Sequence, residues 1–192
     1  RKLLFSATPP GKPIARDVAA AFQAALSRLA AFGAELAEMP GTQFDIEPLW
    51  RVINHPTWRA RFADMAACDG NKMSPSLLRQ LAQAEHVSGV DYQQAMFARA
   101  ALFRHVQALL RDADFLVMPT LSRTALPIGQ ELFDPIEIDG AAYADLRSNW
   151  FPWTMPFNLT GHHAITLPCG TISRKPSWSE VLVFELVWTK SR

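Results

Sequence analysis

A strand–helix–strand pattern at the start of the chain constrains its fold more than any other feature. Residues 2–6 form a short apolar run, and after a connection containing proline and glycine, apolar residues recur at helical spacing from about Asp17 to Phe32. Gly33 stands where a helix C-cap is expected, and residues 34–39 fit a second strand. Because a helix that joins two strands in this way places them parallel in one sheet, the pattern predicts an α/β layer architecture.

The remaining chain continues the alternation of helices and strands. We expect helices over residues 46–65, 77–86, 92–111 and 141–153, and strands over residues 114–118 and 164–167. Pro56 must kink or divide the first of these helices, because proline lacks a backbone N–H. Ser76 is expected to cap the second, and Ser88 with Asp91 has the form of a capping box for the third. Residues 119–140, punctuated by Pro and Gly, predict a long ordered loop of the kind that is often functional.

Composition and charge exclude several classes of protein. Hydrophobic residues make up 49% of the chain and charged residues 19%, with a formal net charge of +1, which is typical of a globular domain rather than a disordered one. Basic residues are scattered, as at Arg51, Arg59 and Arg61, and form no stripe that could neutralise phosphates, so we expect no nucleic-acid partner. No apolar run approaches the roughly 20 residues that span a bilayer, so no membrane partner is expected.

The two cysteines, Cys68 and Cys169, provide neither a disulfide framework nor a metal-binding pair. A reducing cytoplasm is therefore the expected location, and both thiols are expected to be inert core residues. The apolar face of the longest helix is also expected to be core: Met96, Leu102, Phe103, Val106 and Leu110.

Four segments, taken in order, carry a resemblance. They are Gly89-Val90-Asp91-Tyr92 before a helix that contains Arg99, the strand from Asp114 to Thr120, Pro127-Ile128-Gly129, and Phe157 to Gly170. Together they resemble the C-terminal half of the amidase-signature enzymes, and the match covers residues 1 to about 170. The resemblance implies the C-terminal portion of that fold, an α/β structure in which helices cover a mixed sheet.

The sequence departs from the family pattern in two places. His163 stands where the family usually has proline, and residues 171–192 contain no glycine, whereas the family continues with a glycine-rich strand. We therefore expect two parts, residues 1–170 from the amidase-signature domain and a divergent tail at residues 171–192. A frameshift or an unrelated replacement would explain such a tail.

The resemblance also implies that the catalytic residues lie outside this chain. Family members cleave amides with a serine nucleophile, a second serine on a cis peptide and a lysine base, because a hydroxyl must lose its proton to a positioned partner. In the family these groups belong to a Gly/Ser-rich stretch and an upstream lysine, whereas the nine glycines here are never adjacent. Ser74, Ser76 and Lys72 are close in sequence and are interpreted as turn and cap residues. We expect no catalytic residue in this chain.

Trp150, Trp153 and Asn158 are the candidate substrate-pocket residues. The two tryptophans belong to an aromatic-rich span that two prolines keep from forming one regular helix, and Asn158 follows that span. Aromatic residues in such a span either fill the core or line a small-molecule pocket, and the residues themselves leave both interpretations open. In the family this span borders the active-site cleft, so the resemblance favours a pocket for an apolar or aromatic acyl or amine group.

His162 and His163 are adjacent, but successive side chains point in different directions and no third ligand is suitably spaced. The family needs no metal, and we expect no metal and no cofactor. Asp114 and Arg99 match family positions. They are expected to be structural partners of nearby groups and not catalytic residues.

The leading hypothesis is the C-terminal part of an amidase that hydrolyses a small carboxamide by Ser-cisSer-Lys acyl transfer. One alternative is the amidase-like subunit of a tRNA-dependent amidotransferase, against which the aromatic approach to Asn158 and the absence of a basic patch argue. Another is a non-catalytic binding or scaffold module. Self-association is also expected, because the runs at residues 3–5, 115–117 and 181–184 are apolar enough to pair as exposed strand edges.

Overall fold

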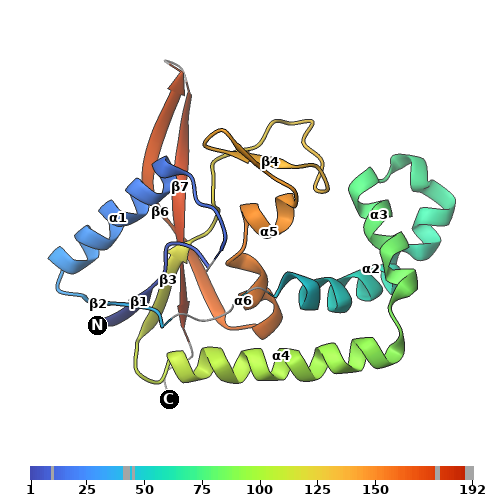
Figure 1. The fold of residues 1–192 in the computed structure, drawn as a ribbon, viewed down its shortest axis with the longest axis horizontal. Helices are drawn as coiled ribbons and strands as arrows, with labels where there is room; N and C mark the ends of the chain where they lie inside the picture. The colour runs from blue at the N-terminus through green and yellow to red at the C-terminus, as the bar shows by residue number, and fades with distance from the viewer. Residues whose placement is uncertain (10, 41–43, 45, 176–177, 189–192) are drawn as a thin grey trace.

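The structure, a computed structural model, describes residues 1–9, 11–40, 44, 46–175 and 178–188 (Figure 1). Its helices are α1 (Arg16–Ala31), α2 (Glu47–Asp69), α3 (Pro75–Gln83), α4 (Gly89–Leu109), α5 (Leu146–Trp150) and α6 (Thr154–Thr160), with 3₁₀ turns at Gly70–Lys72 and Ala84–His86. Its strands are β1 (Lys2–Phe5), β2 (Glu35–Glu38), β3 (Phe115–Pro119), β4 (Ile136–Ile138), β5 (Ala141–Tyr143), β6 (His163–Lys175) and β7 (Trp178–Trp188). Within these described ranges, no helix is long and apolar enough to cross a membrane.

The described strands form a mixed five-stranded sheet in the order β2-β1-β3-β7-β6, and β4 and β5 form a separate hairpin. β1 runs parallel to β2 and β3, whereas β7 runs antiparallel to β3 and β6. The mixed sheet covered by helices, which the family resemblance implies, is confirmed. The prediction that residues 3–5 and 115–117 form exposed strand edges is wrong. Each run pairs with one strand on either side: β1 with β2 and β3, and β3 with β1 and β7. Residues 181–184 pair with β6.

Two hydrophobic clusters cover the two faces of the sheet. Leu3 and Val117 face α1 and the β4–β5 hairpin, while Leu4 and Leu116 face α2, α4 and α6. This alternation follows from the two-residue period of a strand, which sends successive side chains to opposite faces. Helices on both faces also explain why β1 and β3 are apolar along their length.

The starts of α3 and α4 show how local sequence sets helix boundaries. The expected capping box is confirmed: Ser88 Oγ accepts the Asp91 N–H at 3.1 Å, and Asp91 Oδ2 accepts the Ser88 N–H at 3.0 Å. The prediction that Ser76 caps α3 is wrong, because Ser74 occupies the N-cap and Pro75 begins the helix. The Ser76 hydroxyl is buried, donates to Glu131 and accepts the Leu132 N–H at 3.2 Å.

Several element boundaries differ from the expectation for physical reasons. Of the two outcomes expected at Pro56, a kink or a division, division is excluded because α2 continues through this residue. The helix expected over residues 141–153 is wrong at its start, because β5 occupies residues 141–143. The strand expected to stop at Pro168 continues, since β6 is an edge strand that tolerates a missing N–H and the register shifts between Pro168 and Gly170.

The predicted core is wrong at two positions. Phe103 is 40% exposed on α4, and Cys68 is exposed on α2, whereas Cys169 is buried as expected. β6 crosses residue 170, the boundary expected between the domain and its tail. Residues 176, 177 and 189–192 of that tail lie outside the described residues, and the origin of residues 171–192 stays a prediction.

Candidate functional site

The order of the parallel strands points to the carboxyl ends of β1 and β3. From β1 the chain passes through α1 to β2 on one side, while β3 lies on the other side of β1. Connections that leave in opposite directions open a crevice outside the carboxyl ends of the strands, where open α/β sheets bind ligands. Ser6 follows β1 and Thr120 follows β3 at this edge. The Ser6 N–H donates to the Val117 carbonyl at 3.1 Å and holds the two strand ends together.

The loop after β3 is tied to α5 and to the start of α1. The Ser122 N–H donates to the Trp150 carbonyl at 2.7 Å, and the Ser122 carbonyl accepts the Ala15 N–H at 2.7 Å. The Trp150 indole Nε1 donates to the Arg123 carbonyl at 3.1 Å. Because these bonds join segments far apart in sequence, they fix the end of α5 against the carboxyl edge of β3.

The three predicted pocket residues lie in different surroundings. Trp150 is half-buried at the end of α5, with its ring centroid 5.7 Å from that of Phe151. Trp153 is 2% exposed and meets the ring of Phe44 edge-on at 5.2 Å. Asn158 is exposed on α6. The structure brings the two tryptophans to the connection between α5 and α6, and their role in a substrate pocket stays a prediction.

Two buried polar atoms at this edge have no hydrogen-bond partner among the described residues, Trp153 Nε1 and Thr120 Oγ1. The segments that carry them are in contact, since the Thr154 hydroxyl donates to the Thr120 carbonyl at 3.4 Å. An indole N–H can only donate, whereas a hydroxyl can donate or accept. Buried polar groups are rarely left without a partner, so each of these two atoms calls for a hydrogen-bonding group that the described residues do not supply.

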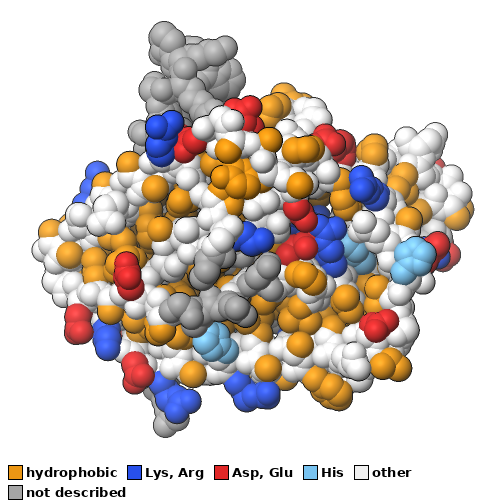
Figure 2. Space-filling model, viewed as in Figure 1, with side chains coloured by type: hydrophobic (Ala, Val, Ile, Leu, Met, Phe, Trp, Pro, Cys, Tyr) orange, Lys and Arg blue, Asp and Glu red, His pale blue; other side chains and the backbone are white. Residues whose placement is uncertain are grey.

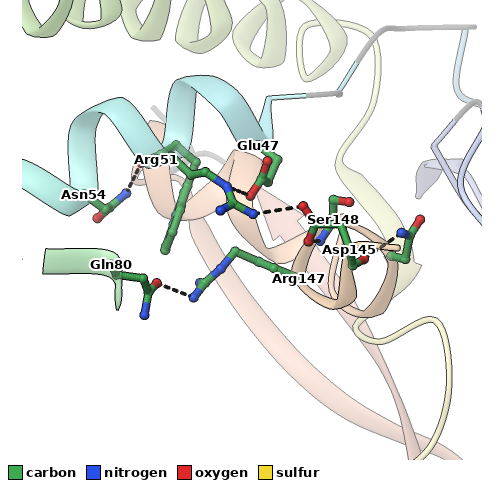
Figure 3. Close-up of polar contacts among 9 residues, drawn as sticks. Glu47, Arg51, Asn54, Gln80, Asp145, Arg147 and Ser148 are labelled. Carbon is green, nitrogen blue, oxygen red and sulfur yellow. Dashed lines mark hydrogen bonds and ion pairs between the residues drawn. The ribbon is translucent and has the colours of Figure 1, made fainter. Parts of the chain in front are cut away.

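A charged network joins α2, α3 and the start of α5 (Figure 3). Arg51 on α2 pairs with Glu47 one turn earlier and, at 2.9 Å, with Asp145. Asp145 also accepts the Ser148 N–H at 3.2 Å, so the same carboxylate caps α5 and ties it to α2. The network therefore sets the direction in which α5 enters the candidate site.

Arg147 lies buried on α5 and has no carboxylate partner in the described part of the chain. Its Nη2 donates to Gln80 Oε1 of α3 at 2.5 Å, and its guanidinium carbon lies 4.5 Å from the ring centroid of Trp50 and 5.6 Å from that of Phe151. Burial lowers the pKa of Arg147, although a guanidinium remains protonated in proteins. Aromatic faces offset part of the cost of burying this charge.

Glu47 shows that this network has two interpretations. Burial raises the pKa of Glu47, and the Arg51 guanidinium opposes that rise. Raised carboxyl pKa values occur at functional sites, but structural ion-pair networks also produce them. Because Glu47 is already paired with Arg51, we interpret the network as a support for α5. The network was not predicted from the sequence: the four-residue spacing of Glu47 and Arg51 was a usable signal, whereas the links to α3 and α5 join distant segments.

The structure separates the residues that could have formed a displaced catalytic set. Lys72 pairs with Asp69 at 2.7 Å, and the Ser76 hydroxyl is bonded to Glu131. Ser74 lies exposed at the start of α3. The lysine amine and the Ser76 hydroxyl are thus held by different carboxylates.

The adjacent histidines face different partners. The His162 ring stacks on Phe103 with centroids 4.8 Å apart, and the His163 ring stacks on Trp188 at 5.8 Å. Burial lowers the pKa of His162, and the neighbouring His163 lowers it further. Among the described residues, no three His, Cys, Asp or Glu side chains gather into a group that could hold a metal.

Asp114 and Arg99 each contact nearby groups, as expected of structural partners, and the absence of a catalytic role stays a prediction. Asp114 accepts the Lys2 N–H at 2.8 Å and pairs with Arg1 at 3.2 Å, so it joins the ends of two neighbouring strands. Backbone hydrogen bonding from Lys2 is the main cause of the lowered pKa of Asp114. Arg99 Nε donates to the Leu159 carbonyl at 2.5 Å and ties α4 to α6.

Comparison with known proteins gives a consistent family. The family model for Amidase matches residues 5–176. An acylamidase of Rhodococcus erythropolis is 29% identical over 151 residues, which cover 76% of this chain and 31% of that protein. A glutamyl-tRNA(Gln) amidotransferase subunit of Mycobacterium bovis is 28% identical over 181 residues, which cover 80% of this chain and 35% of that protein.

Solved structures share the fold across the whole chain. A bacterial aryl acylamidase of the amidase-signature enzymes has a TM-score of 0.78 at 14% identity, covering 99% of this chain and 40% of its own. A 6-aminohexanoate cyclic dimer hydrolase has a TM-score of 0.73 at 19% identity, covering 100% of this chain and 42% of its own. The chain spans about a third of the length of the curated relatives it matches. Because the family model covers most of its residues, the chain belongs to the amidase-signature family.

Proposed function

We propose that this chain is the C-terminal part of an amidase that hydrolyses a small carboxamide by Ser-cisSer-Lys acyl transfer. The serine nucleophile and the lysine base lie, in this proposal, outside these 192 residues. The chain supplies the scaffold and part of the wall of the substrate pocket, with Trp150, Trp153 and Asn158 as candidate wall residues. The observation that carries the proposal is the buried Trp153 Nε1, which has no hydrogen-bond partner among the described residues and precedes Thr154, whose hydroxyl donates to the Thr120 carbonyl after β3.

The chemistry of this edge favours an amide with an apolar or aromatic group. Trp150 and Phe151 present aromatic surface, and Trp153 Nε1 offers a donor to the carbonyl oxygen of the amide. The relatives described as acylamidase and aryl acylamidase act, by their names, on amides of this general kind. Together these features support an anilide or alkyl amide as the substrate class.

Catalysis gives the first test. We expect the purified chain not to hydrolyse acetanilide or simple alkyl amides, because a binding surface without an activated nucleophile forms no acyl intermediate. Turnover that persists after further purification and disappears in Ser74→Ala or Ser76→Ala would overturn the assignment of the catalytic residues to a region outside this chain.

Binding gives the second test, independent of turnover. The six tryptophans give distinguishable indole N–H signals in a ¹H–¹⁵N spectrum, and Trp153→Phe identifies the Trp153 signal by its loss. We expect acetanilide to shift this signal, because the amide carbonyl would accept its hydrogen bond. Trp58, on α2, serves as the control, since its signal is expected to move little. Shifts at other tryptophans with none at Trp153 would place the ligand elsewhere.

A second candidate function is the amidase-like subunit of a tRNA-dependent amidotransferase. It is supported by the curated relative of that description in Mycobacterium bovis, which matches 80% of this chain. Glutamine is polar at both ends, whereas the α5–α6 connection is aromatic, which favours the first proposal. A Trp153 signal that responds to glutamine and not to acetanilide would favour the amidotransferase. A third candidate is a non-catalytic binding module. It would be favoured if the gene upstream of Arg1 encoded neither the lysine nor the Gly/Ser-rich stretch.

A further inference from the structure

Arg147 is a buried cation whose hydrogen-bond partner is neutral. Only 6% of the residue is exposed, and its Nη2 donates to Oε1 of Gln80, which is itself 3% exposed. No hydrogen bond of Arg147 Nε or Nη1 is found among the described residues. A guanidinium carries five N–H donors, so most of this group's capacity is unused. Buried charges are normally paired, and the amide of Gln80 supplies no counter-charge.

The neighbouring carboxylates are engaged elsewhere. Acidic and basic side chains lie together near the middle of the face shown in Figure 2, between α5 and α2. Within this group Glu47 and Asp145 each form an ion pair with Arg51. Neither forms one with Arg147 in the described structure. Arg147 is therefore the cation of the network that lacks a direct counter-ion.

The groups around Arg147 define a ligand. Its guanidinium carbon lies 4.5 Å from the ring centroid of Trp50 and 5.6 Å from that of Phe151. We propose that Arg147, Trp50 and Phe151 form a binding site for a small carboxylate that carries an aromatic group, and that Gln80 occupies this site until the ligand displaces it. A carboxylate accepts two parallel N–H bonds from a guanidinium and neutralises its charge, whereas Gln80 accepts one and leaves the charge uncompensated.

Such a carboxylate is also the acyl product of the proposed reaction, because hydrolysis of a carboxamide by water gives a carboxylic acid, ionised at neutral pH, and an amine. That link alone rests on the proposed function. The neutral amide substrate would compete poorly with Gln80 for Arg147, since both offer an uncharged carbonyl oxygen. The site therefore discriminates between the product and the substrate by charge.

Gln80 belongs to a part of the chain that can withdraw as a unit. We call residues 59–86 the lobe. Arg59 on α2 donates to the Leu81 carbonyl at 3.1 Å and pairs with Glu85 at 2.8 Å, so the second half of α2 is fastened to α3. α3 packs mainly against α2, and its printed links to α5 and to residues 119–140 are polar or cation–π contacts. Polar contacts exchange readily with water, so the lobe can separate from α5 without exposing the core.

The two connections of the lobe are suited to bending. Pro56 has no backbone N–H, and the Thr57 hydroxyl donates to the Ile53 carbonyl at 2.7 Å, both of which favour a bend in a helix. A hollow of about 640 Å³ lies between the middle of α2 and the start of α4, with Pro56, Thr57, Val87 and Gly89 in its lining. It leaves space for both connections to move. Because Arg147 is buried within this chain, a carboxylate reaches it when the lobe carries Gln80 away.

Titration of the ¹⁵N-labelled chain with benzoate at constant ionic strength tests the site. Trp50→Phe identifies the Trp50 indole N–H signal by its loss. We expect benzoate to shift this signal with a Kd on the order of millimolar, while the signal of Trp188 on β7 moves little. Benzamide has nearly the same shape and no charge, so it should bind about tenfold more weakly.

Gln80→Leu separates the proposed site from a purely structural contact. The substitution removes the amide that competes for Arg147 and nearly conserves volume, so benzoate should bind about tenfold more tightly. Gln83→Leu on the same helix is the matched control and should leave the affinity unchanged. Arg147→Lys retains the charge but loses the two-pronged geometry, so benzoate should bind about tenfold more weakly. Circular dichroism confirms that each variant is folded.

Equal affinities for benzoate and benzamide, unchanged benzoate binding in Arg147→Lys, or no gain in Gln80→Leu would each overturn the proposal. The response of the Trp153 signal to acetanilide reports on the proposed function separately. Benzoate binding at Trp50 without an acetanilide response at Trp153 would support this site and contradict the proposed function. An acetanilide response at Trp153 without benzoate binding at Trp50 would overturn this site and leave the proposed function intact.

Discussion

His55 is held between two tryptophans in surroundings that disfavour a charge. Its ring stacks on Trp58 with centroids 5.8 Å apart and meets Trp50 edge-on at 6.2 Å. The residue is 2% exposed, and its Nε2 has no hydrogen-bond partner among the described residues. Burial lowers the pKa of His55 from 6.5 to about 4, and the nearby charge of Arg51 acts in the same direction. His55 is therefore a neutral aromatic residue of the core at physiological pH.

This histidine should make the free energy of unfolding depend on pH. Because its folded pKa of about 4 lies below the unfolded value of 6.5, the unfolded chain binds the proton first as the pH falls. The stability contributed by neutral His55 is complete above pH 6.5 and is lost as the pH falls toward 4, by about 3 kcal/mol.

Urea unfolding of the wild type and of His55→Phe, at neutral pH and near the lower pKa, measures this contribution. Phenylalanine keeps the aromatic packing but does not titrate, so the variant should lose less stability on acidification. Other titrating groups affect both proteins alike and cancel in the comparison. The same acid-induced loss in both proteins would show that His55 does not couple protonation to folding.

At the scale of elements, α1 depends on a side chain from a distant hairpin. Its N-cap residue, Ala15, has no side chain that can cap the helix. Asp139 supplies the cap: its Oδ2 accepts the Arg16 N–H at 2.9 Å and lies 3.4 Å from Arg16 Nε. Asp139 and Gly140 both have positive φ, 53° and 84°, as the tight turn between β4 and β5 requires. The turn thus positions a carboxylate at the positive end of α1.

Substitutions at Asp139 should separate its role as a cap from its role in the turn. Asp139→Gly fits the positive φ without strain and loses the cap, so we expect a loss of about 1 kcal/mol in the free energy of unfolding. Asp139→Ala should cost about 1 kcal/mol more, because alanine is strained in the left-handed region. Asp139→Asn retains an acceptor and tolerates this φ, so its loss should be the smallest. Equal stability of the Gly variant and the wild type, measured by urea unfolding, would contradict the capping role.

The elements that sequence predicted correctly are those with local signals. Apolar periodicity and Gly33 were sufficient for β1, α1 and β2, and Ser88 with Asp91 marked the start of α4. The β4–β5 hairpin was missed although Asp139-Gly140 is a strong turn signal, because the helix expected over residues 141–153 took precedence. The full length of β6 had no local signal, since its pairing with β7 carries it past Pro168.

The same distinction applies to the candidate site. The sequence singled out Trp150 and Trp153, and the structure places both at the connection beside the carboxyl end of β3. The support of that connection could not be predicted, because Arg147 meets Gln80 and Trp50 only after three helices have packed together. Contacts between residues so far apart in sequence follow from the fold and not from spacing.

At the scale of the whole molecule, α2 and α3 project from the side of the covered sheet (Figure 1). α3 packs mainly against α2 and the 3₁₀ turn that follows it. Its links toward the sheet are polar, through Gln80 to Arg147 and through Ser76 to Glu131 and Leu132. β3, in contrast, is buried between two hydrophobic clusters. Stability is therefore distributed unevenly, and α3 should open without unfolding of the sheet.

Hydrogen exchange of the backbone amides should reveal this difference. We expect the amides of α3 to exchange through local opening and those of β3 only through global unfolding. Gln80→Ala removes a hydrogen bond to a buried guanidinium, so exchange in α3 should accelerate about tenfold while β3 changes little. Gln83→Ala, on the same helix, is the matched control, because no hydrogen bond of its side chain is found in the described structure. If α3 and β3 exchanged at the same free energy in the wild type, and Gln80→Ala accelerated both equally, the projecting helices and the sheet would form a single cooperative unit.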